Sequence, residues 1–212
     1  HYPTEFLCAV LTAEKGDQAK VMRFIHEARL MGVPVLPPDV GRSSSDFTVE
    51  DVDDGAVGQK GAIRFGLTAV KGIGDSAVDA ILEARAEGPF RSMTDFLSRV
   101  DTRKVNKRVI EALARCGAMD GFGHTRASIV EGLDALLSAA QRRCEDRDSG
   151  QGSLFDALPV SKAAEAGPPH VPEWPDRQKL AYEREAIGYY VSGHPLDRYA
   201  GRLERLEVTP IG

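Results

Sequence analysis

The sequence predicts a mainly α-helical fold with one small β-hairpin. Apolar side chains recur at the three- and four-residue spacing of helix faces through most of the 212 residues. Two glycine-containing turns, at residues 72–74 and 117–123, each lie between two such helical stretches. A pair of alternating stretches, SDFTVED and AIRFGL, indicates two antiparallel strands. We therefore expect a mixed, mostly helical first part followed by two helix–turn–helix units.

The helices follow in chain order from their apolar stripes and from the residues that end them. The first pattern spans residues 4–14, and the second spans residues 17–31, where Gly32 ends it. The next stretch, VPVLPPDV, should be extended, because each proline disfavours a helical residue before it. Further helices are predicted near residues 67–71, 75–86, 92–99, 105–116, 124–140 and 175–190.

The composition argues against several classes of protein. Apolar residues make up 42% of the chain, but no apolar run approaches the roughly 20 residues of a membrane helix, and no secretory leader opens the chain. The cysteines, Cys8, Cys116 and Cys144, are odd in number and lack paired spacing, which argues against a zinc site or disulfides. We expect a cytoplasmic protein without membrane contact. Because the chain opens at His1 within a helical pattern and stops at EVTPIG, we also expect a longer parent polypeptide.

The most informative local motif is LTAVKGIGDSAVDAIL, in which a short helix leads through Gly72-Ile73-Gly74 into a second helix. Glycines let the backbone turn tightly and leave no side chain between the N–H groups and an anion. Those N–H groups lie at a helix N-terminus, which favours a phosphate oxygen, while Ile73 would anchor the turn and Lys71 adds a charge. The pattern resembles the helix-hairpin-helix motif, which grips a DNA backbone. An ordinary turn is the alternative; a dinucleotide-binding loop fits less well, because position 77 is Ala.

A second, looser unit of the same kind follows, with its turn at residues 117–123 and its second helix from about His124 or Thr125. Residues 60–143 hold 14 Lys and Arg against 10 Asp and Glu, a local charge of +4 in a chain of net charge −5. A solvated helical face would also explain this charge, but two hairpins beside it favour binding to duplex or single-stranded DNA. The predicted DNA-binding residues are Lys71, Gly72, Ile73, Gly74, Arg103, Lys104, Lys107 and Arg108.

No set of side chains indicates catalysis. The acidic stretch VEDVDDG, residues 49–55, could hold a metal, but it falls in an expected hairpin connection, where fixed ligand geometry is hard to achieve. The histidines are dispersed, and no Ser/His/Asp or Cys/His set stands out. We therefore assign no catalytic residue, no metal ligand and no cofactor to this chain.

Residues 144–172 have the composition of a flexible linker, with few large apolar side chains and four prolines. Within them, Gln151-Gly152-Ser153-Leu154-Phe155 places two adjacent apolar residues in polar surroundings. An extended segment can insert such a pair into a partner's pocket. Alternatively, Leu154 and Phe155 fold back onto the hairpin units.

Five ordered blocks resemble the family of bacterial replicative DNA polymerase III alpha subunits: HYPTEFLCAVLTAE, MGVPVLPPDVGRSSSDFTV, IRFGLTAVKGIG, VNKRVIEALARCGAMD and YEREAIGYYVSGHPLDRY. The resemblance implies a C-terminal part of the fingers domain in residues 1–60 and a tandem helix-hairpin-helix domain in 61–143. It further implies a linker with a clamp-binding motif in 144–172, and a C-terminal helix leading toward a missing OB-fold domain in 173–212. The pentapeptide Gln151–Phe155 is similar to the sequence by which proteins dock on the bacterial sliding clamp.

The same resemblance implies that the parent is a DNA-directed DNA polymerase. Its catalytic aspartates and Mg²⁺ would lie in a palm domain that matches nothing here, and other replicase holoenzyme subunits would be partners. Two alternatives remain. One is a non-catalytic interaction module; the other is a repair enzyme, such as a ligase or an error-prone polymerase relative, with similar hairpins.

Overall fold

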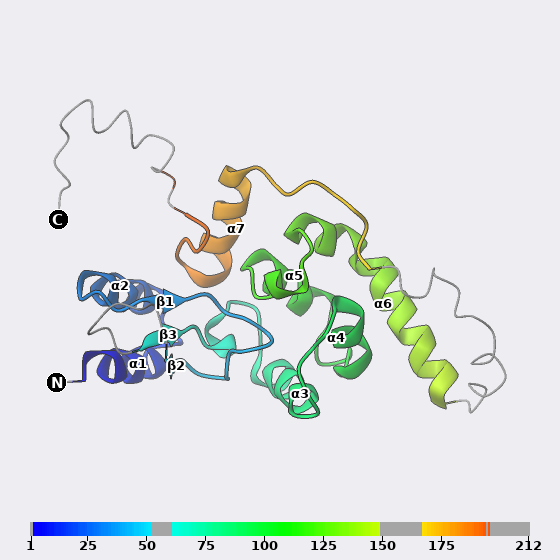
Figure 1. Ribbon diagram of the computed structural model, residues 1–212, viewed down its shortest axis with the longest axis horizontal. Coiled ribbons are helices and arrows are strands. Elements are labelled where there is room, and N and C mark those ends of the chain that lie inside the picture. Colours follow the sequence, from blue (N-terminus) through cyan, green and yellow to red (C-terminus); the bar gives the residue numbers. More distant parts are fainter. Residues whose placement is uncertain (1, 52–60, 149–166, 194, 196–212) are drawn as a thin grey trace.

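The computed structural model describes residues 2–51, 61–148, 167–193 and 195, with the backbone alone described for residues 143–148. In these ranges the chain is built mainly from helices, and one small sheet lies at one end of the molecule, beside α1 and α2 (Figure 1). The mainly α-helical class predicted from the sequence is confirmed. Among the described helices, none is long and apolar enough to cross a lipid bilayer.

The first two helices are α1 (Pro3–Ala13) and α2 (Gln18–Leu30), each within one residue of its predicted bounds. The carboxylate of Asp17 accepts hydrogen bonds from the N–H groups of Ala19 and Lys20, at 3.0 and 3.2 Å, and so caps α2. The buried stripes of the two helices include Leu7, Leu11, Val21 and Ile25.

The sheet contains β1 (Val35–Leu36), β2 (Thr48–Glu50) and β3 (Ala62–Arg64) in the order β1-β3-β2. Strands β2 and β3 are antiparallel, as predicted from their alternation. Strand β1 adds a parallel pairing to β3, with Val35 opposite Ile63, which the sequence did not predict. This pairing joins residues that are far apart in the chain, and β1 is only two residues long, so the local sequence contains no pattern that predicts it.

The second part of the chain begins with a 3₁₀ turn, η1 (Leu67–Ala69), where a short helix was predicted. It continues through α3 (Asp75–Ala86), α4 (Met93–Arg99), α5 (Lys107–Arg115), the 3₁₀ turn η2 (Asp120–Phe122) and α6 (Arg126–Asp148). Side chains of Ser92 and Asn106 cap α4 and α5. Helix α6 extends beyond residue 140, its predicted end, into the stretch that was predicted to be a linker.

The last helix, α7 (Asp176–Ile187), lies near α5, between the end of the molecule that holds the sheet and the end that holds α6 (Figure 1). The guanidinium of Arg115 on α5 lies 4.8 Å from the ring of Tyr182. Just after α7, the ring of Tyr189 faces the guanidinium of Arg29 at 5.5 Å. Helix α7 and the residues that follow it therefore touch both parts of the chain.

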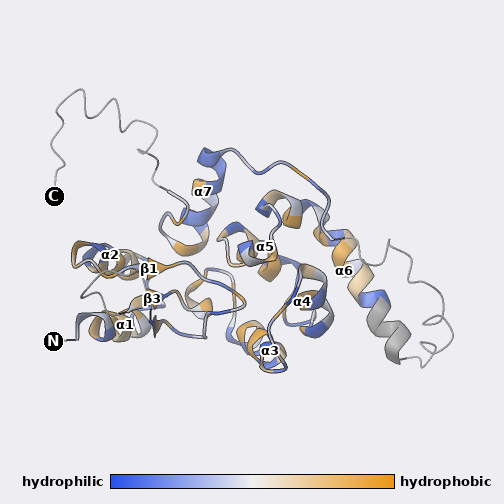
Figure 2. Ribbon diagram, in the orientation of Figure 1, coloured by the Kyte–Doolittle hydropathy of each residue, from blue (hydrophilic) through white to orange (hydrophobic). Residues whose placement is uncertain are grey.

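The buried apolar residues form one cluster that runs from α1 and α2 through the sheet to α6. Phe65, next to β3, contacts the rings of Phe47 and Tyr189, with centroid distances of 4.7 and 5.8 Å. Figure 2 shows that α7, in contrast, is coloured mostly hydrophilic. The predicted boundary between residues 60 and 61 separates β3 from the two strands that it pairs with, and the division into four segments stays a prediction.

Candidate nucleic-acid interface

The first predicted turn, residues 72–74, is held in place by backbone hydrogen bonds and by the burial of Ile73. Gly72 has a φ of 87°, a left-handed conformation that a residue with a side chain rarely adopts. Ile73 is 7% exposed, and its N–H donates to the carbonyl of Val70 at 3.2 Å. The backbone N–H of Lys71 donates to the carbonyl of Ala186, at the end of α7, at 2.8 Å. Lys71, Gly72 and Gly74 are exposed around this anchored centre.

The N-terminus of α3 is open. Its N-cap residue is Gly74, so no side chain accepts hydrogen bonds from the first turn of the helix. Among the described residues, the N–H groups of Gly72, Gly74, Asp75 and Ser76 have no acceptor. A Cβ added at Gly74 would meet nothing within 4 Å, and its φ of −89° suits any residue. The fold itself therefore does not require glycine at position 74. A side chain there would instead hinder an anion that approaches the free N–H groups.

The attraction of this turn for an anion comes mainly from the backbone. Lys71 supplies one positive charge, and the exposed carboxylate of Asp75 at the first helical position offsets it. Unpaired N–H donors and the helix dipole remain, and these favour a phosphate oxygen at close range. Such contacts position a nucleic-acid backbone and carry no information about its base sequence.

The second turn, residues 117–123, differs because the helix that follows it is already capped. The hydroxyl of Thr125 accepts from the N–H of Ser128 at 3.0 Å. The carboxylate of Glu173 accepts from the N–H of Arg126 at 3.0 Å and from the N–H of Ala127 at 3.2 Å. A carboxylate of the same chain therefore occupies the place at α6 where a phosphate would bind.

Glu173 is brought there by residues 167–173, which we call the strap. The backbone of Val171 exchanges hydrogen bonds with the hydroxyl of Ser128 at 3.0 and 3.1 Å. Pro169 lies so close to Gly132 on α6 that a Cβ at this glycine would come within 2.4 Å of the proline ring. Burial alone would raise the pKa of Glu173, but the N–H donors of Arg126, Trp174 and Ala127 hold it below its ordinary value.

The strap was missed at the sequence level, because residues 144–172 were interpreted as one linker. The described residues 167–172 instead pack along the start of α6. Glu173 lies forty-seven residues from Arg126, and a single glutamate at that distance in the sequence does not indicate that it caps a helix.

Four of the predicted basic residues lie between the two turns in the sequence, in the connection after α4 and at the start of α5. Arg99, at the end of α4, donates to the carbonyls of Ala84 and Gly88, so α4 ends beside the C-terminal end of α3. The 12 residues of α3 place that end about 18 Å from Gly74. The connection that holds Arg103 and Lys104 starts there, and α5 separates it from the second turn by about 13 Å. The connection therefore starts beside the end of α3 that lies opposite to Gly74.

The basic residues also differ in how they are paired. Arg103, Lys104 and Arg108 are exposed. Lys107 forms an ion pair with Asp134 on α6, with Nζ–Oδ distances of 2.6 and 2.8 Å. The hydrogen bond to Asp134 raises the pKa of Lys107. Contact of these four residues with DNA stays a prediction.

The remaining expectations from the sequence concern metal binding and the pentapeptide at residues 151–155. Glu50, in the acidic stretch, bonds bidentately to Arg64 at 2.9 and 2.8 Å, and this pairing, against the opposing effect of burial, lowers its pKa. In the ranges with described side chains, no three His, Cys, Asp or Glu residues are grouped closely enough to hold a metal ion. Residues 151–155 lie outside the described residues, so docking through them stays a prediction.

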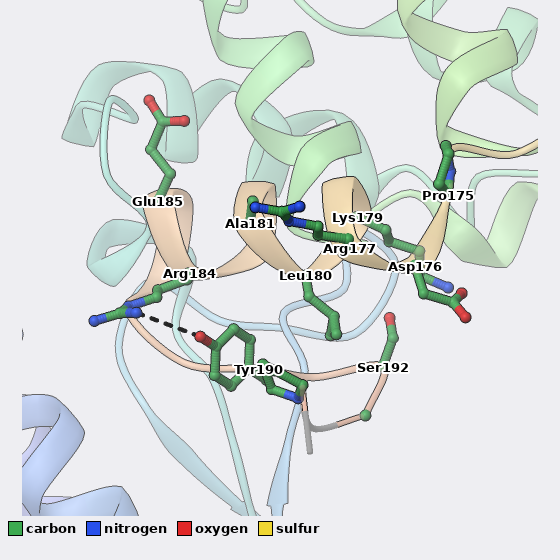
Figure 3. Close-up of a pocket in the computed structure, with 12 residues that line it drawn as sticks. Pro175, Asp176, Arg177, Lys179, Leu180, Ala181, Arg184, Glu185, Tyr190 and Ser192 are labelled. Carbon is green, nitrogen blue, oxygen red and sulfur yellow. Dashed lines mark hydrogen bonds between the residues drawn. The ribbon is translucent and has the colours of Figure 1, made fainter. Parts of the chain in front are cut away.

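A cavity of about 940 Å³ lies between α7 and the residues that follow it (Figure 3). Leu180 and Tyr190 face it, and the guanidinium of Arg184 contacts the hydroxyl of Tyr190 at 3.4 Å. Arg177 and Lys179 share the lining with Asp176 and Glu185. This mixture of charges favours no particular class of ligand, in contrast to the surroundings of the first turn.

Comparison with known proteins agrees with this geometry. Residues 32–129 match the model of the family described as "Helix-hairpin-helix motif". The DNA polymerase III subunit alpha of Thermus aquaticus is 45% identical over 210 residues, which cover 99% of this chain and 16% of the relative. The subunits of the same name from Vibrio cholerae and Escherichia coli K12 are 40% and 36% identical, and each match covers 97% of this chain and 17% of the relative.

The chain thus spans about a sixth of the length of these curated relatives. The match nonetheless extends over almost the whole of this chain, at an identity well above the level of chance. The chain belongs to the family of the DNA polymerase III alpha subunits, of which it corresponds to one segment.

Proposed function

We propose that this chain is the part of a replicative DNA polymerase that holds the DNA backbone, and that the turn at residues 71–74 makes the principal contact. The observation that carries the proposal is the open N-terminus of α3, with Gly74 in place of a capping side chain. The match to the helix-hairpin-helix family and the relatives named as polymerase subunits support it. DNA synthesis itself would belong to the full-length polypeptide, with its acidic residues and Mg²⁺ outside this segment.

Under this proposal only the first of the two turns contacts the DNA backbone. The first turn offers free N–H donors, and the second offers donors that Glu173 has already taken. The second turn then serves to hold the strap and α7 in place. A single backbone contact of this kind binds weakly alone, so it would support a polymerase that is also tethered in another way.

The test is the salt dependence of DNA binding by the full-length polypeptide that carries this chain. Neutralising one phosphate contributes about 0.9 to the slope of log affinity against log salt concentration. Replacing Lys71 with Ala should lower the magnitude of the slope by about this amount and weaken binding for every DNA sequence equally. An unchanged affinity and slope would leave the turn as a connection between two helices.

The second contact that we propose is with the sliding clamp, through Gln151, Gly152, Ser153, Leu154 and Phe155. The argument is chemical: an adjacent Leu and Phe can enter an apolar pocket while a glutamine bonds at its rim. The strap, which follows the pentapeptide in the chain, packs against the start of α6, so a clamp bound at residues 151–155 would be tethered to the folded segment by a short connection. Other replicase subunits as partners, and the cytoplasm as location, belong to the same proposal.

Replacing both Leu154 and Phe155 with Ala tests this contact. Binding of the full-length polypeptide to purified clamp, measured by calorimetry, should fall by at least tenfold, because two buried apolar side chains are lost. Primer extension without the clamp should be unaffected. Clamp binding at the original affinity would favour the alternative in which these side chains fold back onto the same chain.

A further inference from the structure

We propose that a groove beside the first turn binds a second phosphodiester of the same DNA strand, with Lys15 and Gly16 as its contacts. This inference rests on the proposed contact of residues 71–74 with DNA and extends it across the fold, onto the connection between α1 and α2. We call this feature the hairpin groove.

The hairpin groove has a volume of about 340 Å³. One wall is the α1–α2 connection with Lys15, Gly16 and Gln18, and the other is the segment 68–73. Val21 and Ile187 also line it, and both are almost fully buried. The hydrogen bond from the Lys71 N–H to the carbonyl of Ala186 fixes the second wall to the end of α7. The groove is therefore part of the fold and continuous with the turn that we expect to hold DNA.

The charge of the hairpin groove suits a phosphate. Its lining includes two lysines, Lys15 and Lys71, and no carboxylate, although the whole chain carries a net charge of −5. The cavity of Figure 3, by comparison, is lined by Asp176 and Glu185 as well as by cationic side chains.

Three acids on or near the α1–α2 connection already have partners in the fold. Asp17 caps α2, and Glu14 accepts a hydrogen bond from Lys20 at 2.8 Å. Asp46 lies 2.5 Å from the Nζ atom of Lys15, with both side chains partly exposed. An exposed pair of this kind is weak, so the ammonium can turn to a phosphate with little loss.

The backbone of the α1–α2 connection repeats the property found at Gly74. A Cβ added at Gly16 would meet nothing within 4 Å, and its φ lies outside the range in which a side chain is strained. Its N–H donates no hydrogen bond to the rest of the described chain. Gly16, which the fold does not demand, thus lines one wall of the groove, and Gly74 follows directly after Ile73, the last residue of the other wall. At position 16 a side chain would obstruct an approaching backbone.

The experiment measures duplex binding by the full-length polypeptide across a salt titration. Removing Lys15 alone would leave Asp46 unpaired, so the informative variant is Lys15→Ala combined with Asp46→Asn. We expect it to lower the slope magnitude by about 0.9 and the affinity by on the order of tenfold. The effects of this variant and of Lys71→Ala should add in the triple variant. Gly16→Val should weaken binding without changing the unfolding midpoint.

Lys20→Ala combined with Glu14→Gln is the matched control, because it removes another exposed ion pair of the same helix pair, and neither residue lines the groove. If Lys71→Ala lowers the slope while the Lys15/Asp46 variant and Gly16→Val do not, the groove is not a phosphate site and the proposed function survives. If none of the three lowers it, the proposed function fails as well. An equal loss with the Lys20/Glu14 variant would show a general effect of removing an ion pair and overturn the assignment to the groove.

Discussion

The guanidinium of Arg126 on α6 lies 2.7 Å from the carboxylate of Glu183 on α7, with the two side chains 3% and 0% exposed. Glu183 also accepts hydrogen bonds from the N–H groups of Val191 and Ser192 and from the hydroxyl of Ser192. The same guanidinium bonds to Asp120 in the second turn. One buried charge network therefore joins the second turn, α6, α7 and the segment after it.

Replacing Glu183 with Ala should destabilise the protein strongly, because the buried Arg126 would lose its one fully buried carboxylate partner and keep only the partly exposed Asp120. Breaking a buried pair in this way costs about 3–5 kcal/mol, measurable as a change in the free energy of unfolding by urea. Asp134→Asn is the control, since it breaks the exposed pair with Lys107 and should change stability little. A loss below about 1 kcal/mol for Glu183→Ala would mean that the network does not hold α7.

Acid should weaken the same junction. Burial tends to raise the pKa of Glu183, but the bonds from Ser192, Arg126 and Val191 lower it below its ordinary value of 4.5, and Glu173 is also lowered. A lowered folded-state pKa stabilises the protein fully above the ordinary value, and this stability is lost as the pH falls through the folded-state pKa. At pH values below about 4.5, the urea concentration at the midpoint of unfolding should therefore decrease. The decrease should be smaller in Glu183→Gln. Equal acid profiles for the two proteins would contradict this explanation.

Replacing Glu173 with Ala should uncap α6. Two N–H groups lose their acceptor, and loss of a cap costs about 1 kcal/mol. Hydrogen exchange at the amides of Arg126 and Ala127 should accelerate, while the amides of α3 keep their rates. DNA binding should not weaken, since the second turn is not the DNA contact in this account. A clear loss of DNA affinity would mean that the strap is needed for the grip.

The sequence predicted the helices well because their signals are local. Asp17, Ser92 and Asn106 cap helices that begin within two residues of the predicted starts, and Gly74 marks the start of α3. The anchoring of Ile73 followed from its place between two glycines. These features depend on neighbours in the chain, so a single sequence contains them.

Features set by distant partners were missed. The parallel pairing of β1 with β3, the capping of α6 by Glu173 and the ion pair between Lys107 and Asp134 each join residues at least 27 positions apart. The basic residues 103–108 were grouped with the turns because they lie between them in the sequence. In the fold, the hydrogen bonds from Arg99 to Ala84 and Gly88 place the start of this stretch beside the C-terminal end of α3, opposite to Gly74.

The central claim is that the α3 N-terminus is left uncapped so that a phosphate can bind there. Gly74→Asp tests it, because the new carboxylate would take the free N–H donors itself, as Glu173 does at α6. An N-cap aspartate is slightly better than glycine for the helix, by a few tenths of a kcal/mol. The fold should thus be as stable as before or more so, while DNA binding falls.

Gly121→Asp serves as the matched control. It adds the same charge at a position in the second turn where a Cβ also meets nothing within 4 Å.

The decisive measurement is the affinity of the full-length polypeptide for primed duplex DNA over a salt titration. Gly74→Asp should lower both the affinity and the magnitude of the slope, by at least about 0.9 in the slope, without loss of stability. Gly121→Asp should leave the slope unchanged. Wild-type affinity and slope in Gly74→Asp, or an equal loss in Gly121→Asp, would contradict the claim.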